Sequence, residues 1–139
     1  METVVLTAAL QQIRLVRLLI IEDDEMLRSL ATELLSEICE HIHAFENADD
    51  ALVHMLSNSD DVGEIAIVDQ NLHGQLTGSD FASMIHERWP AMGVILSSGS
   101  PLPAPVTHSL TRFVLKPWSL DQMHDTIQEL LQAGVARTV

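Results

Sequence analysis

The stretch from Glu64 to Asp69 limits what this chain can fold into more than any other. Its four middle residues are apolar and rich in β-branched side chains, and an acid bounds each end. Such a run is typical of a central strand in a parallel sheet, where helices cover both faces. In an open α/β sheet the carboxyl ends of the strands border the crevice that binds ligands, so Asp69 is expected at a functional site. The alternative is that Asp69 only caps the following loop.

Four further apolar runs read as short strands, at residues 16–21, 41–45, 92–96 and 112–115. Short connections between alternating strands and helices favour a parallel sheet with right-handed crossovers. The sequence therefore predicts an α/β fold with a doubly wound, five-stranded parallel sheet.

Apolar residues at three- and four-residue spacing predict the helices between these strands. The first helix is expected from about Asp24 to Ile38, with one apolar stripe made of Leu27, Leu30, Leu34 and Ile38. Residues suited to capping mark the starts of the later helices: Asn47, Thr77 or Ser79, and Ser119.

Prolines interrupt the helical pattern before the last strand. Pro101, Pro103 and Pro105 lack amide donors and disfavour helical geometry. We therefore expect the fourth helix of the fold, which would connect the fourth strand to the fifth, to be shortened or replaced by a Pro-rich loop over residues 101–111.

Composition narrows the functional classes. The 139 residues carry a net charge of −13 and only seven Lys and Arg, which argues against nucleic-acid binding. No apolar run is long enough for a transmembrane helix, and the single Cys39 agrees with a reducing cytoplasm. We expect one main domain over residues 16–132, an N-terminal extension over 1–15 and a C-terminal tail over 133–139.

Polar residues follow the apolar runs at the edge where strand ends converge: Glu22, Asp23, Asp69, Ser98 and Lys116. Carboxylates in one crevice repel each other unless a cation neutralises them, and an all-oxygen set favours Mg²⁺ or Mn²⁺ over zinc. A carboxylate can also accept a phosphoryl group to form an acyl phosphate. Asp69 is thus a candidate nucleophile, with Lys116 and Ser98 holding phosphoryl oxygens.

Four blocks resemble the signature blocks of the response-regulator receiver domain of two-component signalling. They are IIEDDE at 20–25, IVD at 67–69, LSSG at 96–99 and FVLKP at 113–117. The resemblance covers residues 16–132 and implies a flavodoxin-like sheet of order 2-1-3-4-5. It also implies a Mg²⁺ or Mn²⁺ cofactor, and no enzymatic activity beyond the domain's own phosphorylation and dephosphorylation.

The resemblance implies a role for each matched acid. Asp69 corresponds to the phosphoacceptor, Asp23 to a direct metal ligand and Glu22 to a supporting acid. Asn71 would offer its backbone carbonyl to the metal.

The resemblance also implies a switch. Ser98, or Ser97 if the alignment shifts by one residue, corresponds to the switch hydroxyl, Lys116 to the cation that senses the phosphoryl group, and Phe113 to the aromatic that turns inward. The chain departs from the family pattern because Phe113 lacks the hydroxyl of the Tyr often found there. His73 also replaces the usual Pro, and a lone loop His is expected to face solvent.

The leading hypothesis is a stand-alone receiver that a histidine kinase or histidine phosphotransfer protein phosphorylates on Asp69. It would signal in the cytoplasm through an unknown effector protein, as a monomer or weak homodimer. Neither nucleic acid nor a membrane is an expected partner, and no output domain is expected after the last helix. The alternatives are a phosphate sink or shuttle and a phosphorylation-independent receiver-like adaptor. A phosphohydrolase ranks last, because it would need a second acid where Asn71 stands.

Overall fold

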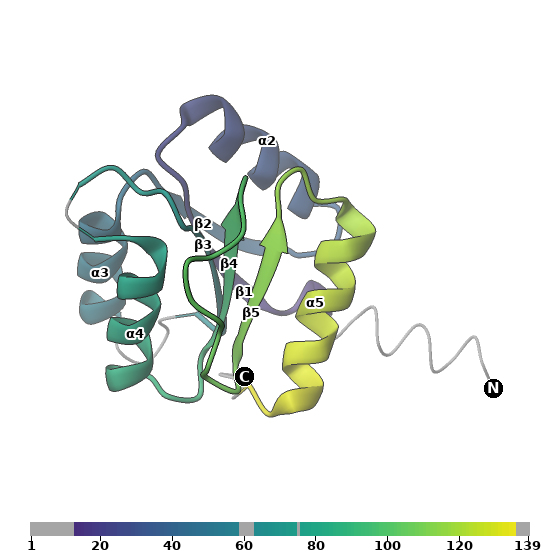
Figure 1. Cartoon of the computed structure of the whole chain (residues 1–139). Helices are drawn as coiled ribbons and strands as arrows, with labels where there is room; N and C mark the ends of the chain where they lie inside the picture. Colours follow the sequence, from purple (N-terminus) through teal and green to yellow (C-terminus); the bar gives the residue numbers. More distant parts are fainter. Residues whose placement is uncertain (1–12, 59–62, 75, 136–139) are drawn as a thin grey trace.

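The five predicted strands form one parallel sheet. The computed structural model describes residues 13–58, 63–74 and 76–135, so most of the expected N-terminal extension lies outside the described residues. The sheet order is β2-β1-β3-β4-β5, which confirms the predicted topology (Figure 1). The strands are β1 (Arg17–Ile21), β2 (His41–Phe45), β3 (Ile65–Asp69), β4 (Gly93–Ser98) and β5 (Thr111–Leu115).

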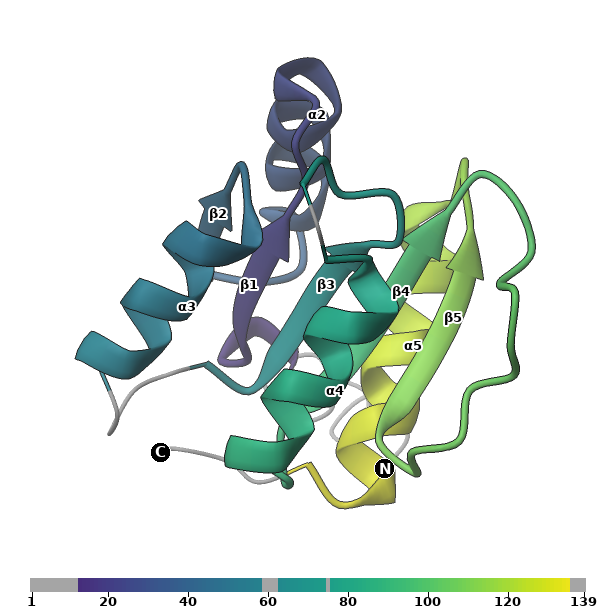
Figure 2. The same cartoon turned by 60° about the vertical axis from the view of Figure 1, so that its left-hand side comes forward.

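Helices cover both faces of this sheet (Figures 1 and 2). One face carries α2 (Glu25–Leu35) and α5 (Leu120–Ala133), and the other carries α3 (Ala48–Ser57) and α4 (Gly78–Arg88). Within the described residues, none of the helices combines the length and apolar character needed to cross a bilayer.

Strand β3 is the centre of the core, and all five of its residues are buried. Ile65 and Ile67 belong to the apolar cluster under α5, whereas Ala66 and Val68 belong to the cluster under α3 and α4. Alternate side chains therefore serve opposite faces, and this is why the strand is apolar without interruption until Asp69.

Side-chain caps fix where the helices begin. Asn47 accepts a hydrogen bond from the backbone N–H of Asp50, and Ser119 accepts one from Gln122. Thr77, rather than Ser79, caps α4 in a reciprocal capping box. This cap fixes where α4 begins, and it therefore sets the length of the loop that leads from Asp69, at the end of β3, to α4.

Helix α2 is shorter and more exposed than predicted. Its N-cap is Asp24, whose Oδ1 accepts from Leu27 N at 2.9 Å, and its residue Leu35 is buried. Leu27 and Leu30 are 42% and 57% exposed, so the apolar stripe predicted for this helix is left largely uncovered over the first two turns. The predicted end at Ile38 is wrong, because the helix ends three residues earlier.

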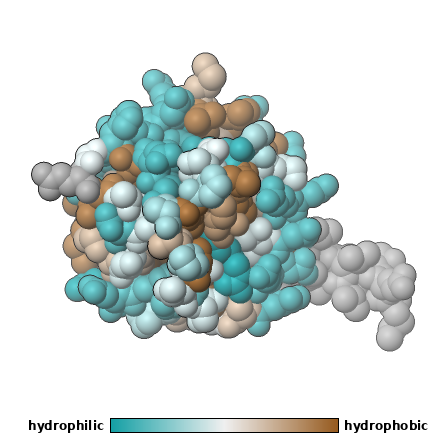
Figure 3. Space-filling model, viewed as in Figure 1, coloured by the Kyte–Doolittle hydropathy of each residue, from teal (hydrophilic) through white to brown (hydrophobic). Residues whose placement is uncertain are grey.

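The physical reason is that the first turns of α2 stand away from the sheet. A cavity of about 360 Å³ lies between them, the sheet and the segment that follows β5, and Leu34, Ile67 and Trp118 are among its lining residues. Apolar surface is visible over α2 at the top of Figure 3.

Residues 99–110 connect β4 directly to β5 without a helix, which agrees with the predicted Pro-rich replacement. A pair of stacked imidazoles ties this loop to α4: the rings of His86 and His108 are 3.5 Å apart and inclined by 8°. His86 Nε2 lies 3.1 Å from the backbone oxygen of Met92.

Candidate functional site

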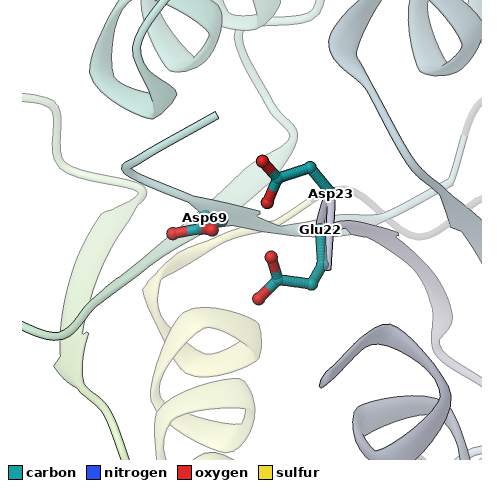
Figure 4. A group of neighbouring side chains, drawn as sticks. All are labelled: Glu22, Asp23 and Asp69. Carbon is teal, nitrogen blue, oxygen red and sulfur yellow. The ribbon is translucent and has the colours of Figure 1, made fainter. Parts of the chain in front are cut away.

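Three carboxylates meet at the carboxyl ends of β1 and β3. Glu22 and Asp23 directly follow β1, and Asp69 is the last residue of β3. One oxygen of each lies within 4.8 Å of the other two, and Figure 4 shows the three groups turned toward the same space. The structure thus brings together the acids that the sequence placed at this edge.

Lys116 neutralises part of this negative charge. Its Nζ donates a hydrogen bond to Glu22 Oε1 at 2.8 Å and lies 3.4 Å from Asp69 Oδ1. Burial lowers the pKa of Lys116, but the hydrogen bond to Glu22 and the charge of Asp69 outweigh burial, and the net pKa is raised. The ammonium group is therefore held in its charged form beside the predicted phosphoacceptor.

Burial also acts on the carboxylate of Glu22. Burial raises its pKa from 4.5 to about 7, although the hydrogen bond from Lys116 opposes this rise and the nearby Asp69 adds to it. Its Oε2 accepts a hydrogen bond from the backbone N–H of Asp24 at 3.3 Å. A divalent cation would favour the ionised form of this group.

Ser97 and Ser98 are adjacent in β4, so their side chains lie on opposite faces of the sheet. Leu96 pairs with Phe113 and Ser98 pairs with Leu115, so Ser98 and Phe113 share one face of the sheet. Ser98 is buried, and its Oγ accepts from Ser100 N at 3.2 Å. Ser97 projects to the opposite face and pairs with Asp69 in the neighbouring strand, so the role of Ser98 as the switch hydroxyl stays a prediction.

Asn71 stands in the loop after β3, where the sequence placed it. Its backbone N–H donates to Asp69 Oδ1 at 3.1 Å, which orients the carboxylate of Asp69. The contribution of its backbone carbonyl to a metal stays a prediction.

Three neighbours of the site were not predicted as its members. Arg28, on the first turn of α2, donates to the backbone oxygen of Glu22 at 2.9 Å. Gln70 is buried, and its side-chain oxygen accepts from both the backbone N–H and the hydroxyl of Ser79. His73 Nδ1 lies 2.9 Å from Asp23 Oδ2, although the His73 side chain is 93% exposed.

Signals for these three residues were weak in the sequence. An Arg in a first helical turn usually faces water, and a Gln after a strand has no fixed partner. For His73 the only signal was its position in the loop after Asp69. His73 faces solvent as expected, since its side chain is 93% exposed, but its contact with Asp23 was not predicted.

The donor set fits a hard divalent cation such as Mg²⁺ or Mn²⁺. Carboxylate oxygens are the preferred ligands of these ions, and the carboxylates of Glu22 and Asp69 are mostly buried. Asp23 Oδ2 is buried and accepts no hydrogen bond from the described residues, which is the state expected of an oxygen reserved for a cation.

Comparisons with known proteins agree with this geometry. Residues 18–128 match the family model described as "Response regulator receiver domain". Over 74 residues the chain is 32% identical to the hydrogenase transcriptional regulatory protein HoxA of Cupriavidus necator. The matched segment makes up 50% of this chain but only 15% of HoxA.

Solved structures show the same fold. The signal receiver domain of an HD domain-containing protein from Pseudomonas fluorescens superposes with a TM-score of 0.73 at 24% identity, covering 86% of this chain and 96% of that chain. A response regulator receiver protein from Sinorhizobium medicae gives a TM-score of 0.72 at 18% identity, covering 85% and 95%. With the family model matching most of its length, the chain belongs to the response-regulator receiver domain family.

Proposed function

We propose that this protein is a phosphoacceptor receiver of a two-component or phosphorelay system, phosphorylated on Asp69. The observation that carries the proposal is the joint placement of Asp69, two further acids and Lys116 around one space. Phosphoryl transfer to a carboxylate depends mainly on orientation and on cancelling charge, and this arrangement provides both.

In the proposed transfer, a carboxylate oxygen of Asp69 attacks the phosphorus of a phosphohistidine. The bond from phosphorus to the donor imidazole breaks, and the imidazole nitrogen keeps the electron pair. Glu22, Asp23 and Asp69 would hold Mg²⁺ or Mn²⁺, whose charge offsets that of the phosphoryl oxygens. Lys116 offsets further charge from the other side, since its Nζ already lies 3.4 Å from Asp69.

A histidine kinase or histidine phosphotransfer protein is the proposed donor. Its phosphohistidine must reach Asp69, and so its surface must cover the neighbouring surface of this protein. Met26 and Leu30 on α2 are 78% and 57% exposed close to the acids that follow β1. Exposed apolar residues of this kind gain burial when a protein partner docks.

Phosphorylation would then shift a population between two conformations. The phosphoryl group favours the state in which Ser98 and Lys116 close on it, and Phe113 follows because it shares the face of Ser98. The altered surface would bind an effector protein. The buried and unpaired Cys39 agrees with a cytoplasmic setting.

Incubation with acetyl phosphate and Mg²⁺ tests the proposal by mass spectrometry. We expect one added phosphoryl group in the wild type and none in Asp69→Asn, with Asp49→Asn on α3 as a control that keeps labelling. Unmodified wild-type protein would contradict phosphoacceptor function and favour the adaptor. Rapid loss of the label would instead indicate a phosphate sink or shuttle.

A further inference from the structure

We propose that Gln70 is a positioning residue for phosphoryl transfer to Asp69, and that it acts through the loop that carries Asn71. This inference rests on the proposed function, because it concerns the same phosphoacceptor. Gln70 directly follows Asp69 at the end of β3 and is only 7% exposed. A buried amide side chain needs hydrogen-bond partners, and the partners of the Gln70 oxygen lie at the start of α4.

Gln70 binds the first amide groups of α4. The first N–H groups of a helix have no partner within the helix itself. The backbone oxygen of Gln70 accepts from Gly78 N at 2.9 Å, and its side-chain Oε1 accepts from Ser79 N at 2.9 Å. The hydroxyl of Ser79 donates to the same Oε1 at 2.7 Å. We call these three hydrogen bonds the Gln70 clamp.

The Gln70 clamp is also tied to the sheet. The backbone N–H of Gln70 donates to the backbone oxygen of Ser97 in β4 at 2.8 Å. The two backbones at the clamp lie in close contact, since a Cβ on Gly78 would stand 2.7 Å from the Cα of Gln70. The start and the end of the connection between β3 and α4 are therefore held together beside the central strands.

Asn71 links the clamp to the phosphoacceptor. Its backbone N–H donates to Asp69 Oδ1 at 3.1 Å, and its backbone carbonyl is the one that the sequence predicts as a metal ligand. The residue itself is exposed, so packing contributes little to its position. Its position depends instead on the preceding Gln70, which the clamp fixes at both backbone and side chain.

Loss of the clamp should therefore misplace Asn71 and loosen the carboxylate of Asp69. A nucleophile must keep its attacking oxygen within a narrow range of directions, and a small misplacement slows the transfer. Residues that orient the ligands of a metal without touching it change the metal affinity by about tenfold or more when they are replaced. If Gln70 only stabilised the start of α4, its replacement would lower the free energy of unfolding and change neither quantity.

Hydrogen exchange, followed by NMR in the metal-free protein, tests the clamp without phosphorylation. In Gln70→Met, which keeps the size of the side chain but removes the acceptor, the amides of Asn71 and Ser79 should exchange about tenfold faster than in the wild type. Asn47→Ala is the matched control, because it also removes a helix cap, but at the start of α3. It should leave both amides unchanged. Unchanged exchange of the Asn71 amide in Gln70→Met would overturn the proposal.

Labelling by acetyl phosphate at saturating Mg²⁺ gives a second readout. Gln70→Met should be labelled about tenfold more slowly than the wild type and should bind Mg²⁺ about tenfold more weakly in titration calorimetry. Asn47→Ala should match the wild type in both measurements, although it is less stable. A wild-type rate in Gln70→Met, or an equal loss in Asn47→Ala, would show that the role of Gln70 is only structural.

Variants of Ser79 test the same clamp from its other side. Ser79→Ala keeps the backbone donor and loses the hydroxyl donor, so it should slow labelling less than Gln70→Met does. Ser79→Thr should restore most of that loss, and the pair carries the comparison should Gln70→Met fail to fold. Absence of labelling in the wild type would refute the proposed function, and hydrogen exchange would then decide by itself whether the clamp holds Asn71.

Discussion

Glu22→Gln should make the metal-free protein more stable at alkaline pH, although it removes a charge that pairs with Lys116. Burial raises the pKa of Glu22 to about 7, so the folded protein binds a proton there more tightly than the unfolded chain, where the pKa is 4.5. The stability from this proton is present below the unfolded pKa and is lost as pH rises through about 7. Gln cannot lose a proton in this range.

The magnitude follows from the two pKa values. Each tenfold difference in proton affinity corresponds to about 1.4 kcal/mol, so Glu22 should lower the free energy of unfolding by about 2.5 kcal/mol between about pH 5 and pH 8. Gln keeps an oxygen to accept from Lys116 but loses the acceptor for Asp24 N, at a cost of about 1 kcal/mol. The variant should therefore be slightly less stable than wild type at the acidic end and more stable at the alkaline end.

Urea unfolding in the presence of a chelator, at several pH values, measures this difference. Glu33→Gln, at an exposed position of α2, is the control and should follow the wild-type pH dependence. The reasoning is refuted if Glu22→Gln and wild type lose stability in parallel as the pH rises. With Mg²⁺ the advantage of the variant at alkaline pH should shrink, because the cation binds the ionised carboxylate of Glu22 and stabilises the wild type more than the variant.

Three further perturbations test the site and its supports. Gly78→Ala would place a Cβ 2.5 Å from the backbone oxygen of Asp69. We therefore expect the free energy of unfolding, measured with urea, to fall by about 1–3 kcal/mol and phosphorylation to slow. Gly99→Ala, where nothing lies within 4 Å of the added Cβ, should change neither quantity. Thr77→Ala removes the cap of α4 and should lower the free energy of unfolding by about 1 kcal/mol, with Thr77→Ser restoring most of it. Burial and the neighbouring His108 lower the pKa of His86, so the free energy of unfolding should fall as the pH drops below the ordinary histidine pKa. His86→Gln should remove this pH dependence. An NMR titration that finds an unshifted pKa for His86 would contradict the prediction.

The fold was predictable because the strands and caps carry strong local signals. The apolar run of β3 and the capping residues Asn47 and Ser119 fix element types without tertiary information. The convergence of Asp69 and Lys116 followed from the parallel sheet, since strand ends meet at one edge.

The position of α2 was not predictable in the same way. The spacing of Leu27 and Leu30 identifies a helix, but periodicity does not say how closely that helix approaches the sheet. The contact of His73 with Asp23 was equally hidden, because it depends on the path of a loop and on a side-chain rotamer.

The attachment of α2 leaves a hollow between its first turns and the body of the protein. The helix is anchored by its last turn at Leu35, and its first residue follows the two acids Glu22 and Asp23 almost directly. A hollow separates its first turns from Trp118, while Arg28 ties these turns to the backbone oxygen of Glu22. Closing this hollow would bury leucine surface beside the two acids and would therefore stabilise the closed arrangement.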